Sequence, residues 1–262
     1  PLVPFHTWLP DAHVEAPAPI SVFLAGLLLK MGGYGFLRIN IGVLGEASQT
    51  FALVFITFGL LTMFYGAIVA LMQKDLKKMI AMTSINHMGF VILGAFTGNL
   101  LGVSGAIFQM FNHGIAIGLL FMLSGYIHEQ TGTREIPILK GLQKNIPRTA
   151  TILTLGSLAG MGAPIFSLFI SEFMVIAGAI AFNPVLAVAI LIPIITVSYF
   201  IWMMRRTVMS NNDKEVHYHD MTWFSASTLF FYLIPLILLI IIPALLLNMT
   251  DPIANTLISA LG

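Results

Sequence analysis

Four side chains that can carry a proton stand inside strongly apolar stretches of this chain. Lys30 lies within ISVFLAGLLLKMGGYGFL, His87 within MTSINHMGFV, His113 within QMFNHGIAIG and Glu172 within SEFMVIAG. A charged side chain near the middle of a bilayer costs on the order of 2.5 to 3.5 kcal/mol, so a charge inside a spanning helix indicates a functional site. Histidine titrates closest to physiological pH and can both accept and release a proton. If the helices turn these four residues inward, they form a polar line through the membrane.

Each of these residues also has a structural interpretation. A single histidine in a membrane helix more often hydrogen-bonds a neighbouring helix than carries protons. Glu172 could serve only to neutralise Lys30. For Lys30 itself, the structural alternative is that its ammonium reaches the membrane interface, which long lysines manage only near helix ends. Apolar residues from Ile20 to Leu29 and from Met31 to Leu37 disfavour that alternative.

The composition predicts a membrane protein. Of the 262 residues, 58% are hydrophobic and 9% are charged, whereas an ordinary soluble domain has about 25% charged residues. The net charge of +1 gives no reason to expect a nucleic-acid partner. With 0 Cys, the chain offers no thiolate ligands, so we expect no metal or redox cofactor in the chain itself.

The long apolar runs predict an all-α, polytopic transmembrane bundle. A spanning helix needs about 20 mostly apolar residues, and no strand-type alternation of a membrane barrel runs through these segments. The chain offers about seven such runs by the same length criterion. They are Ile20–Leu44, Phe51–Met72, Met79–Leu100, Val103–Ile127, Ala150–Phe182, Val185–Met204 and Phe224–Leu247.

Two of the predicted spans should be broken. Ala150–Phe182 is too long for one straight crossing and contains GMGAP, with Gly162 and Pro164. Proline removes a backbone hydrogen bond and kinks or unwinds a helix, and such a break at membrane depth is tolerated only inside protein or beside a water-filled cavity. Glu172 follows this break, just as Lys30 follows Pro17 and Pro19.

Positive charge predicts the orientation of the bundle. Ten of the 12 Lys and Arg residues lie in three connections that fall on one side of the membrane. They are Lys74, Lys77, Lys78, Arg134, Lys140, Lys144, Arg148, Arg205, Arg206 and Lys214. By the positive-inside rule that side is cytoplasmic, and residues 251–262, which contain no Lys or Arg, lie outside.

We assign no functional site to two other polar motifs. The tail His217–Asp220, HYHD, contains residue types that ligate metals, but histidines two positions apart in a polar loop are typical of solvated surface. The run Gln73–Lys78, QKDLKK, is interpreted as a connection that sets the membrane topology.

Several long motifs together resemble a known family. They are HTWLPDAHVEAPAPISVFLAGLLLKMGGYGFLR, QKDLKKMIAMTSINHMGF, FNHG and SEFM. These motifs resemble the antiporter-like membrane subunits of respiratory complex I, a family shared with Mrp antiporters and membrane-bound hydrogenases. Within it the chain is most similar to the middle antiporter-like subunit, because the acidic Glu172 stands where sister subunits tend to carry lysine.

The resemblance implies roles for individual residues. Lys30 matches the lysine of the family's central hydrophilic axis, and Glu172 matches the acidic residue on the exit side of the proton path. His87 and His113 match the histidines between them, so that a proton would pass from Lys30 through His87 and His113 to Glu172.

The resemblance also implies two further histidines and a larger context. His6 and His13 match a pair at the broken helix that begins the first motif. The fold would be part of an inverted-repeat, antiporter-like bundle, and residues 1–262 would be a single transmembrane domain. We expect this domain to be the C-terminal part of a longer subunit, because the family's earlier glutamate and its paired lysine belong upstream.

The implied function is proton translocation in a redox-driven, complex I-like oxidoreductase of the NADH:quinone type, or of a related type whose electron donor is a deazaflavin (F420), ferredoxin or a formate/hydrogen system. Flavin, iron–sulfur clusters and quinone would belong to partner subunits, namely a peripheral redox arm and other membrane subunits. The chain would lie among lipids of a bacterial or archaeal cell membrane or of the mitochondrial inner membrane. The alternatives are a subunit of an Mrp-type cation/proton antiporter, driven by an existing gradient, and a structural scaffold.

Overall fold

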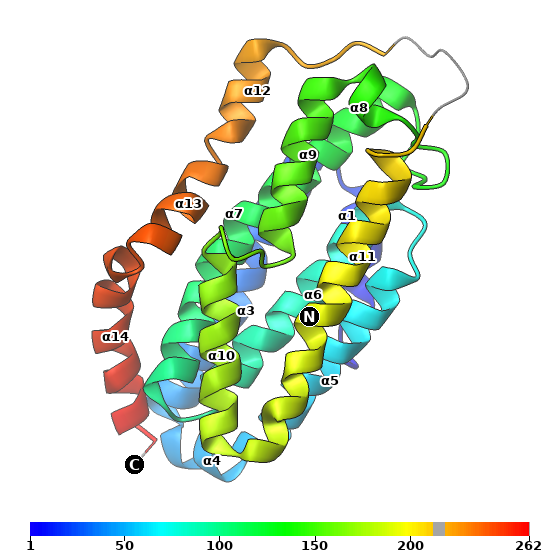
Figure 1. The fold of residues 1–262 in the computed structure, drawn as a ribbon. Helices are drawn as coiled ribbons and strands as arrows, with labels where there is room; N and C mark the ends of the chain where they lie inside the picture. Colours follow the sequence, from blue (N-terminus) through cyan, green and yellow to red (C-terminus); the bar gives the residue numbers. More distant parts are fainter. Residues whose placement is uncertain (212–217, 262) are drawn as a thin grey trace.

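The computed structural model describes residues 1–211 and 218–261, which form an elongated bundle of helices (Figure 1). Within these ranges the regular structure is helical, which confirms the predicted all-α class. The helices are α1 (Trp8–Glu15), α2 (Ala18–Phe23), η1 (Leu24–Leu28), α3 (Leu29–Gly35), η2 (Phe36–Ile41), α4 (Gly45–Thr50), α5 (Ala52–Leu71), α6 (Leu76–Ala95), α7 (Leu100–Thr131), α8 (Leu142–Asn145), α9 (Pro147–Gly160), α10 (Leu168–Phe182), η3 (Pro184–Ile190), α11 (Leu191–Thr207), α12 (Trp223–Phe230), α13 (Leu233–Ile241) and α14 (Ala244–Ser259).

Five helical stretches of the described residues are long and apolar enough to cross a membrane. They are Ala18–Ile41, Ala52–Leu71, Leu100–Thr131, Pro184–Thr207 and Trp223–Ile241. The remaining two predicted spans correspond to α6, whose sequence is more polar, and to the consecutive pair α9 and α10. In Figure 1 these two helices follow one another along the bundle, so this part of the chain runs its length once. The count of seven spans stays a prediction.

Both predicted helix breaks are present. The segment between α9 and α10 turns at Gly162, whose φ of +70° favours glycine. The first break lies between α1 and α2, where Pro17 is extended with ψ of 156°. The structure adds a feature without a sequence signal, because the π-helical segments η1 and η2 flank α3.

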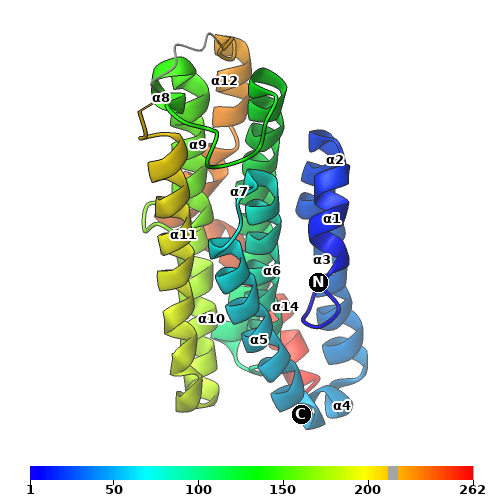
Figure 2. The same cartoon turned by 90° about the vertical axis from the view of Figure 1, so that its right-hand side faces the viewer.

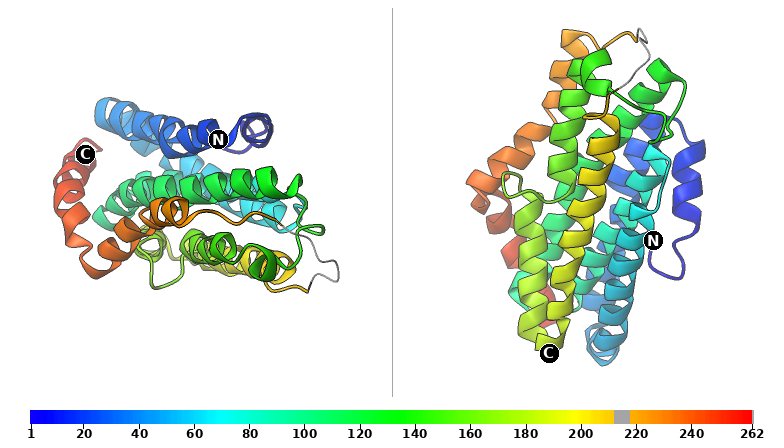
Figure 3. Two further views of the ribbon diagram at one scale, coloured as in Figure 1. Left: turned by 90° about the horizontal axis from the view of Figure 1, so that it is seen from above. Right: turned by 45° about the vertical axis from the view of Figure 1, so that its right-hand side comes forward.

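The helices form three layers when seen along the bundle (Figure 3). The N-terminal helices α1 to α3 lie on one side of α6 and α7, and α9 to α11 lie on the other, as Figure 2 also shows. Helix α6 is the most deeply placed, since all but two of its 20 residues are buried. The middle layer therefore carries the residues that the two outer layers can reach.

Glycines bring α5 and α6 into close contact. A Cβ atom on Gly66 would lie 2.5 Å from the backbone nitrogen of Asn86, and one on Gly89 would lie 2.7 Å from that of Met63. Small residues let membrane helices approach backbone to backbone. This contact sets the position of the α6 segment that contains His87.

The basic connections meet at one end of the bundle. Backbone bonds join Leu76 N to Arg134 O at 2.9 Å and Ile136 N to Lys74 O at 2.7 Å, and Gly141 N donates to Ser210 Oγ at 3.2 Å. The far end holds α4 and the end of α14, where a Cβ on Gly45 would meet Ala260 O. We call the first end the basic end. Lys214 lies outside the described residues, and the side of the membrane that the basic end faces stays a prediction.

Asp220, in the connection between α11 and α12, caps the N-terminus of α9. Its carboxylate accepts from Arg148 N at 2.8 Å, from Thr149 N at 3.2 Å and from Thr149 Oγ1 at 2.8 Å. Burial works against the charged form, but these hydrogen bonds and one from Met221 N outweigh it and hold the pKa of Asp220 below its ordinary value. The prediction that HYHD is only solvated surface is thus wrong for Asp220. His219 is exposed, and His217 lies outside the described residues.

We predict that Gly66→Ala destabilises the protein by about 1 to 3 kcal/mol, the usual cost of overpacking. The added methyl group meets backbone of α6, which cannot turn aside as a side chain can. A thermal-shift assay on the detergent-purified protein measures the effect as a lower Tm. Gly32→Ala is the matched control, because a Cβ there meets nothing within 4 Å. Equal Tm values for the two variants would contradict the close contact of α5 with α6.

We predict that Asp220→Ala lowers stability at neutral pH by about 1 to 2 kcal/mol, the range for loss of a helix cap. Because the pKa of Asp220 is lower in the folded protein than in the unfolded chain, its contribution is present above the unfolded value. It is lost as the pH falls through the folded value. The Tm difference between wild type and variant should therefore shrink below about pH 4. A difference that stays constant down to pH 3 would show that the carboxylate charge is not involved.

Candidate functional site

Lys30 stands at the start of α3, directly after the π-helical segment η1. In this segment the Leu29 N–H bonds to Leu24 O, whereas an α-helix would direct it to Ala25 O. The Lys30 ammonium donates to Ala25 O. The π-helical turn thereby provides a backbone acceptor for a cation within an apolar span.

The second partner of Lys30 is His113 on α7. The Lys30 Nζ atom hydrogen-bonds Nδ1 of His113, whose side chain is fully buried. A charged ammonium donates this bond, so Nδ1 of His113 accepts and a neutral His113 carries its proton on Nε2. Glycine helps here as well, because a Cβ on Gly114 would lie 3.2 Å from Gly26 O. The close approach of η1 to α7 thus brings the lysine to the histidine.

His87 on α6 lies next to His113. The two imidazole rings have centroids 5.5 Å apart and are nearly perpendicular, with an interplanar angle of 84°. His87 is fully buried as well, and its Nε2 lies 3.5 Å from Oε1 of Glu172 on α10. The structure therefore brings all four residues together in the order Lys30, His113, His87, Glu172. The expected order of the two histidines was wrong.

Glu172 is held against the break between α9 and α10. Its side chain is buried, with 4% exposed. A Cβ on Gly162 would lie 2.7 Å from Oε2 of Glu172. Only glycine therefore fits both the turn and the carboxylate. Gly162 and Glu172 both line an apolar groove between α10 and α11.

Polar residues next to the titratable residues in the sequence fix the rotation of α6, α7 and α10. Asn86, beside His87, donates to Thr196 Oγ1 on α11 at 2.9 Å. Asn112, beside His113, donates to Ser171 Oγ at 3.1 Å, and Ser171 stands beside Glu172. Ser171 in turn donates to Gln109 Oε1 at 2.5 Å. Such bonds between buried helices position the titratable side chains that flank them.

His6 and His13 lie outside this chain of contacts. His6 packs edge-on against Tyr65, with ring centroids 4.5 Å apart. His13 stacks on Phe121 of α7 with centroids 4.1 Å apart. Both are buried. Their predicted place on a proton path stays a prediction.

One buried charge was missed by the sequence analysis. Lys77, interpreted as part of a topology-setting connection, is only 3% exposed and donates to Ala16 O at 2.6 Å. Its neighbours Lys74 and Lys78 have the same sequence character and are not buried. The only sequence signal is its position two residues after Asp75, which caps α6 by accepting from Lys78 N at 3.0 Å. In the described part of the chain, no cluster of three metal-ligating side chains occurs.

Residues 1–198 match the family described as NADH:quinone oxidoreductase/Mrp antiporter, TM. The chain is 41% identical over 251 residues to NADH-quinone oxidoreductase subunit M of Rickettsia prowazekii (strain Madrid E), covering 95% of this chain and 50% of that protein. The chain thus spans about half the length of the curated relatives it matches.

Solved structures agree with this match. A chain of respiratory complex I from Thermus thermophilus superposes with a TM-score of 0.93 at 30% identity, covering 100% of this chain and 56% of that one. A chain of the Mrp complex from Dietzia sp. DQ12-45-1b has a TM-score of 0.87 at 20% identity, covering 100% of this chain and 58% of that chain, and shares the fold. The chain belongs to the transmembrane family of NADH:quinone oxidoreductase and Mrp antiporter subunits.

Proposed function

We propose that this chain carries protons through the membrane as part of a proton-pumping, NADH-quinone oxidoreductase-type complex. The observation that carries the proposal is the contact chain Lys30, His113, His87, Glu172, which links four helices through the buried interior. Four titratable groups in sequence are more than helix packing requires. The 41% identity to a subunit M supports the redox-driven type of complex.

The geometry supports a stepwise transfer. Lys30 gives a proton to Nδ1 of His113, and His113 releases the proton on its Nε2 towards His87. His87 then passes a proton from Nε2 to Oε1 of Glu172. Each step moves one proton and leaves the donor one charge lower. Histidine suits the two inner positions because its ring has two nitrogens, so that it can accept a proton on one and release a proton from the other.

Electron transfer belongs to partner subunits in this proposal. Iron–sulfur clusters are held by cysteine thiolates, and this chain has 0 Cys. Flavin, iron–sulfur clusters and quinone are therefore assigned to a peripheral arm and to other membrane subunits. A change of charge in a neighbouring subunit would release the proton of Lys30 and so drive the transfer.

The second candidate is a subunit of an Mrp-type cation/proton antiporter, since the matched family includes these antiporters. The two functions differ in what drives the proton. Pumping that depends on NADH oxidation supports the redox-driven complex. Sodium efflux driven by a pH gradient, from a complex that oxidises no NADH, would support the antiporter.

As a member of a transmembrane family with five apolar helical stretches among its described residues, the chain is an integral membrane protein. We propose seven crossings, with α6 and the α9–α10 pair as the additional two, as one part of an inverted-repeat fold. The basic end is proposed to face the cytoplasm, or the matrix of a mitochondrion, and the C-terminus to face outside. The gathering of the basic connections at one end supports this orientation.

We predict that Lys30→Met and Glu172→Gln each reduce proton pumping by roughly tenfold or more in the assembled complex, the scale of a lost proton-transfer group. Each change removes the titratable group at one end of the four-residue proton path and keeps a side chain of similar size. The measurement is NADH-driven acidification of inverted membrane vesicles, with assembly checked by native gel electrophoresis. Lys74→Met, which removes an exposed lysine, is the control and should pump normally. Unimpaired pumping by either test variant would overturn the proposal.

A further inference from the structure

Lys77 is a buried cation that the four-residue chain does not use. It is the second residue of α6 and lies at the basic end, with 3% of its surface exposed. Its ammonium has three protons to donate, and Ala16 O is its one acceptor among the described residues. A buried charge is costly unless it is fully partnered, so its position needs a reason.

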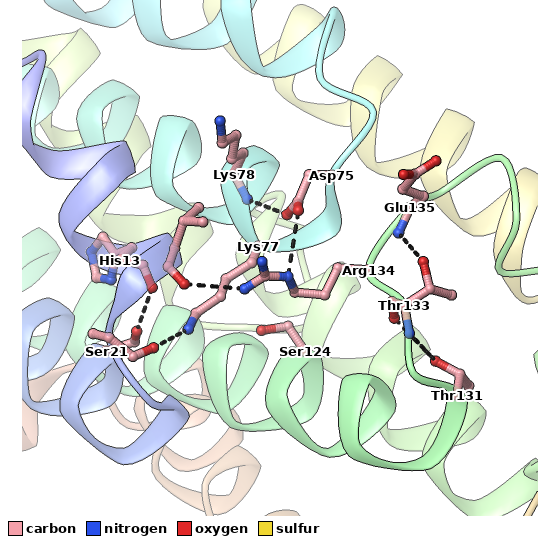
Figure 4. A network of polar contacts seen from close by, with 12 residues as sticks. His13, Ser21, Asp75, Lys77, Lys78, Ser124, Thr131, Thr133, Arg134 and Glu135 are labelled. Carbon is pink, nitrogen blue, oxygen red and sulfur yellow. Dashed lines mark hydrogen bonds and ion pairs between the residues drawn. The ribbon is translucent and has the colours of Figure 1, made fainter.

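One reason is visible at the end of α1 (Figure 4). The break at Pro17 leaves carbonyl groups of the last turn of α1 without helical partners. Ser21 Oγ donates to His13 O and Arg134 Nη1 to Val14 O, both at 3.1 Å, and Lys77 donates to Ala16 O. Positive charge is favourable at a helix C-terminus. Arginine could fill this anchoring role as well as lysine does.

The surroundings of Lys77 offer more than an anchor. Its Nζ atom meets the same helix turn that carries His13, whose ring is fully buried. Both ring nitrogens of His13 lack a hydrogen-bond partner in the described part of the chain. His13 stacks on Phe121 of α7, the helix that also carries His113, the hydrogen-bond partner of Lys30. It can therefore accept a proton on one nitrogen and release one from the other.

On the solvent side, Lys77 adjoins an ion pair. Arg134 Nε lies 3.5 Å from Asp75 Oδ2, and each of these side chains is 23% exposed. The charges of Asp75 and Arg134 both act on Lys77. Figure 4 shows this pair and Lys77 together where the α5–α6 connection meets the residues after α7. A partly exposed ion pair thus lies close to the buried Lys77 at the basic end.

We infer that Lys77 takes up protons at the basic end and passes them through His13 to Lys30. This inference rests on the proposed function. It adds a proton donor before Lys30 to the path Lys30, His113, His87, Glu172. Lys77 gives one proton to His13, is reprotonated from the solution at the basic end, and His13 delivers its proton to Lys30. Lys30 accepts this proton in its neutral form, after it has passed its own proton to His113. Each proton taken up adds one positive charge to the path, and that charge leaves when a proton is released at Glu172.

Replacing Lys77 with arginine distinguishes an anchoring role from a proton-carrying role. Arginine keeps the positive charge and the donors that anchor α1, but it does not release a proton in proteins. If Lys77 only anchors the helix end, Lys77→Arg should pump normally. If Lys77 carries protons, Lys77→Arg should assemble and should fail to pump.

The test compares Lys77→Arg, Lys30→Met and the exposed-lysine control Lys74→Met in the full complex. Assembly is measured by native gel electrophoresis and pumping by NADH-driven acidification of inverted vesicles. We expect Lys77→Arg to assemble at the wild-type level and to lose roughly tenfold or more of its pumping, while Lys74→Met keeps it. Normal pumping by Lys77→Arg together with failure of Lys30→Met would overturn this inference alone. Normal pumping by both would overturn the proposed function as well.

A second variant tests the inference if the Lys77→Arg complex does not assemble. Lys77→Gln is neutral and still has an N–H group to donate towards Ala16 O. Loss of pumping by an assembled Lys77→Gln complex supports the proton-carrying role, and normal pumping overturns it. If neither variant assembles, the role of the ammonium is structural and the inference is wrong.

Discussion

An ammonium group inside an apolar helix bundle must be given acceptors, and this requirement organises the site. Lys30 meets it with Ala25 O, which the π-helical segment η1 makes available, and with Nδ1 of His113. The histidine must therefore face α3, and its partner His87 must face Glu172. Each of the four titratable groups thus lies beside the next one. Glycines at the helix contacts make the distances short enough for this arrangement.

Much of this arrangement could be predicted from the sequence because it depends on local signals. Long apolar runs predict the helices, and the charges at Lys30 and Glu172 are conspicuous because apolar residues surround them. Pro17 and the GMGAP segment predict both breaks. The order of His87 and His113 could not be predicted, because it depends on helix rotations. Those rotations are fixed by contacts between distant residues, such as that of Asn86 with Thr196.

The same limit explains the residues that were misjudged. Lys74, Lys77 and Lys78 are alike in sequence, and only the position of α1 shows that Lys77 is buried beneath its broken end. Asp220 looks like loop surface until α9, 71 to 72 residues earlier in the chain, is placed against it. In each case a charged residue in a polar stretch satisfies the end of a helix that is remote in sequence. Sequence patterns describe such helix ends well only when the capping residue is local.

We propose that the two histidines act one after the other on a single path. The most direct measurement is a double-mutant cycle of pumping per NADH oxidised, using His113→Gln, His87→Gln and the double variant in the assembled complex. On a single path, the second substitution adds little once the first has interrupted it. We predict that the double variant pumps no worse than the slower single variant. Losses that multiply in the double variant would show that the two histidines belong to two separate routes and would overturn the single path.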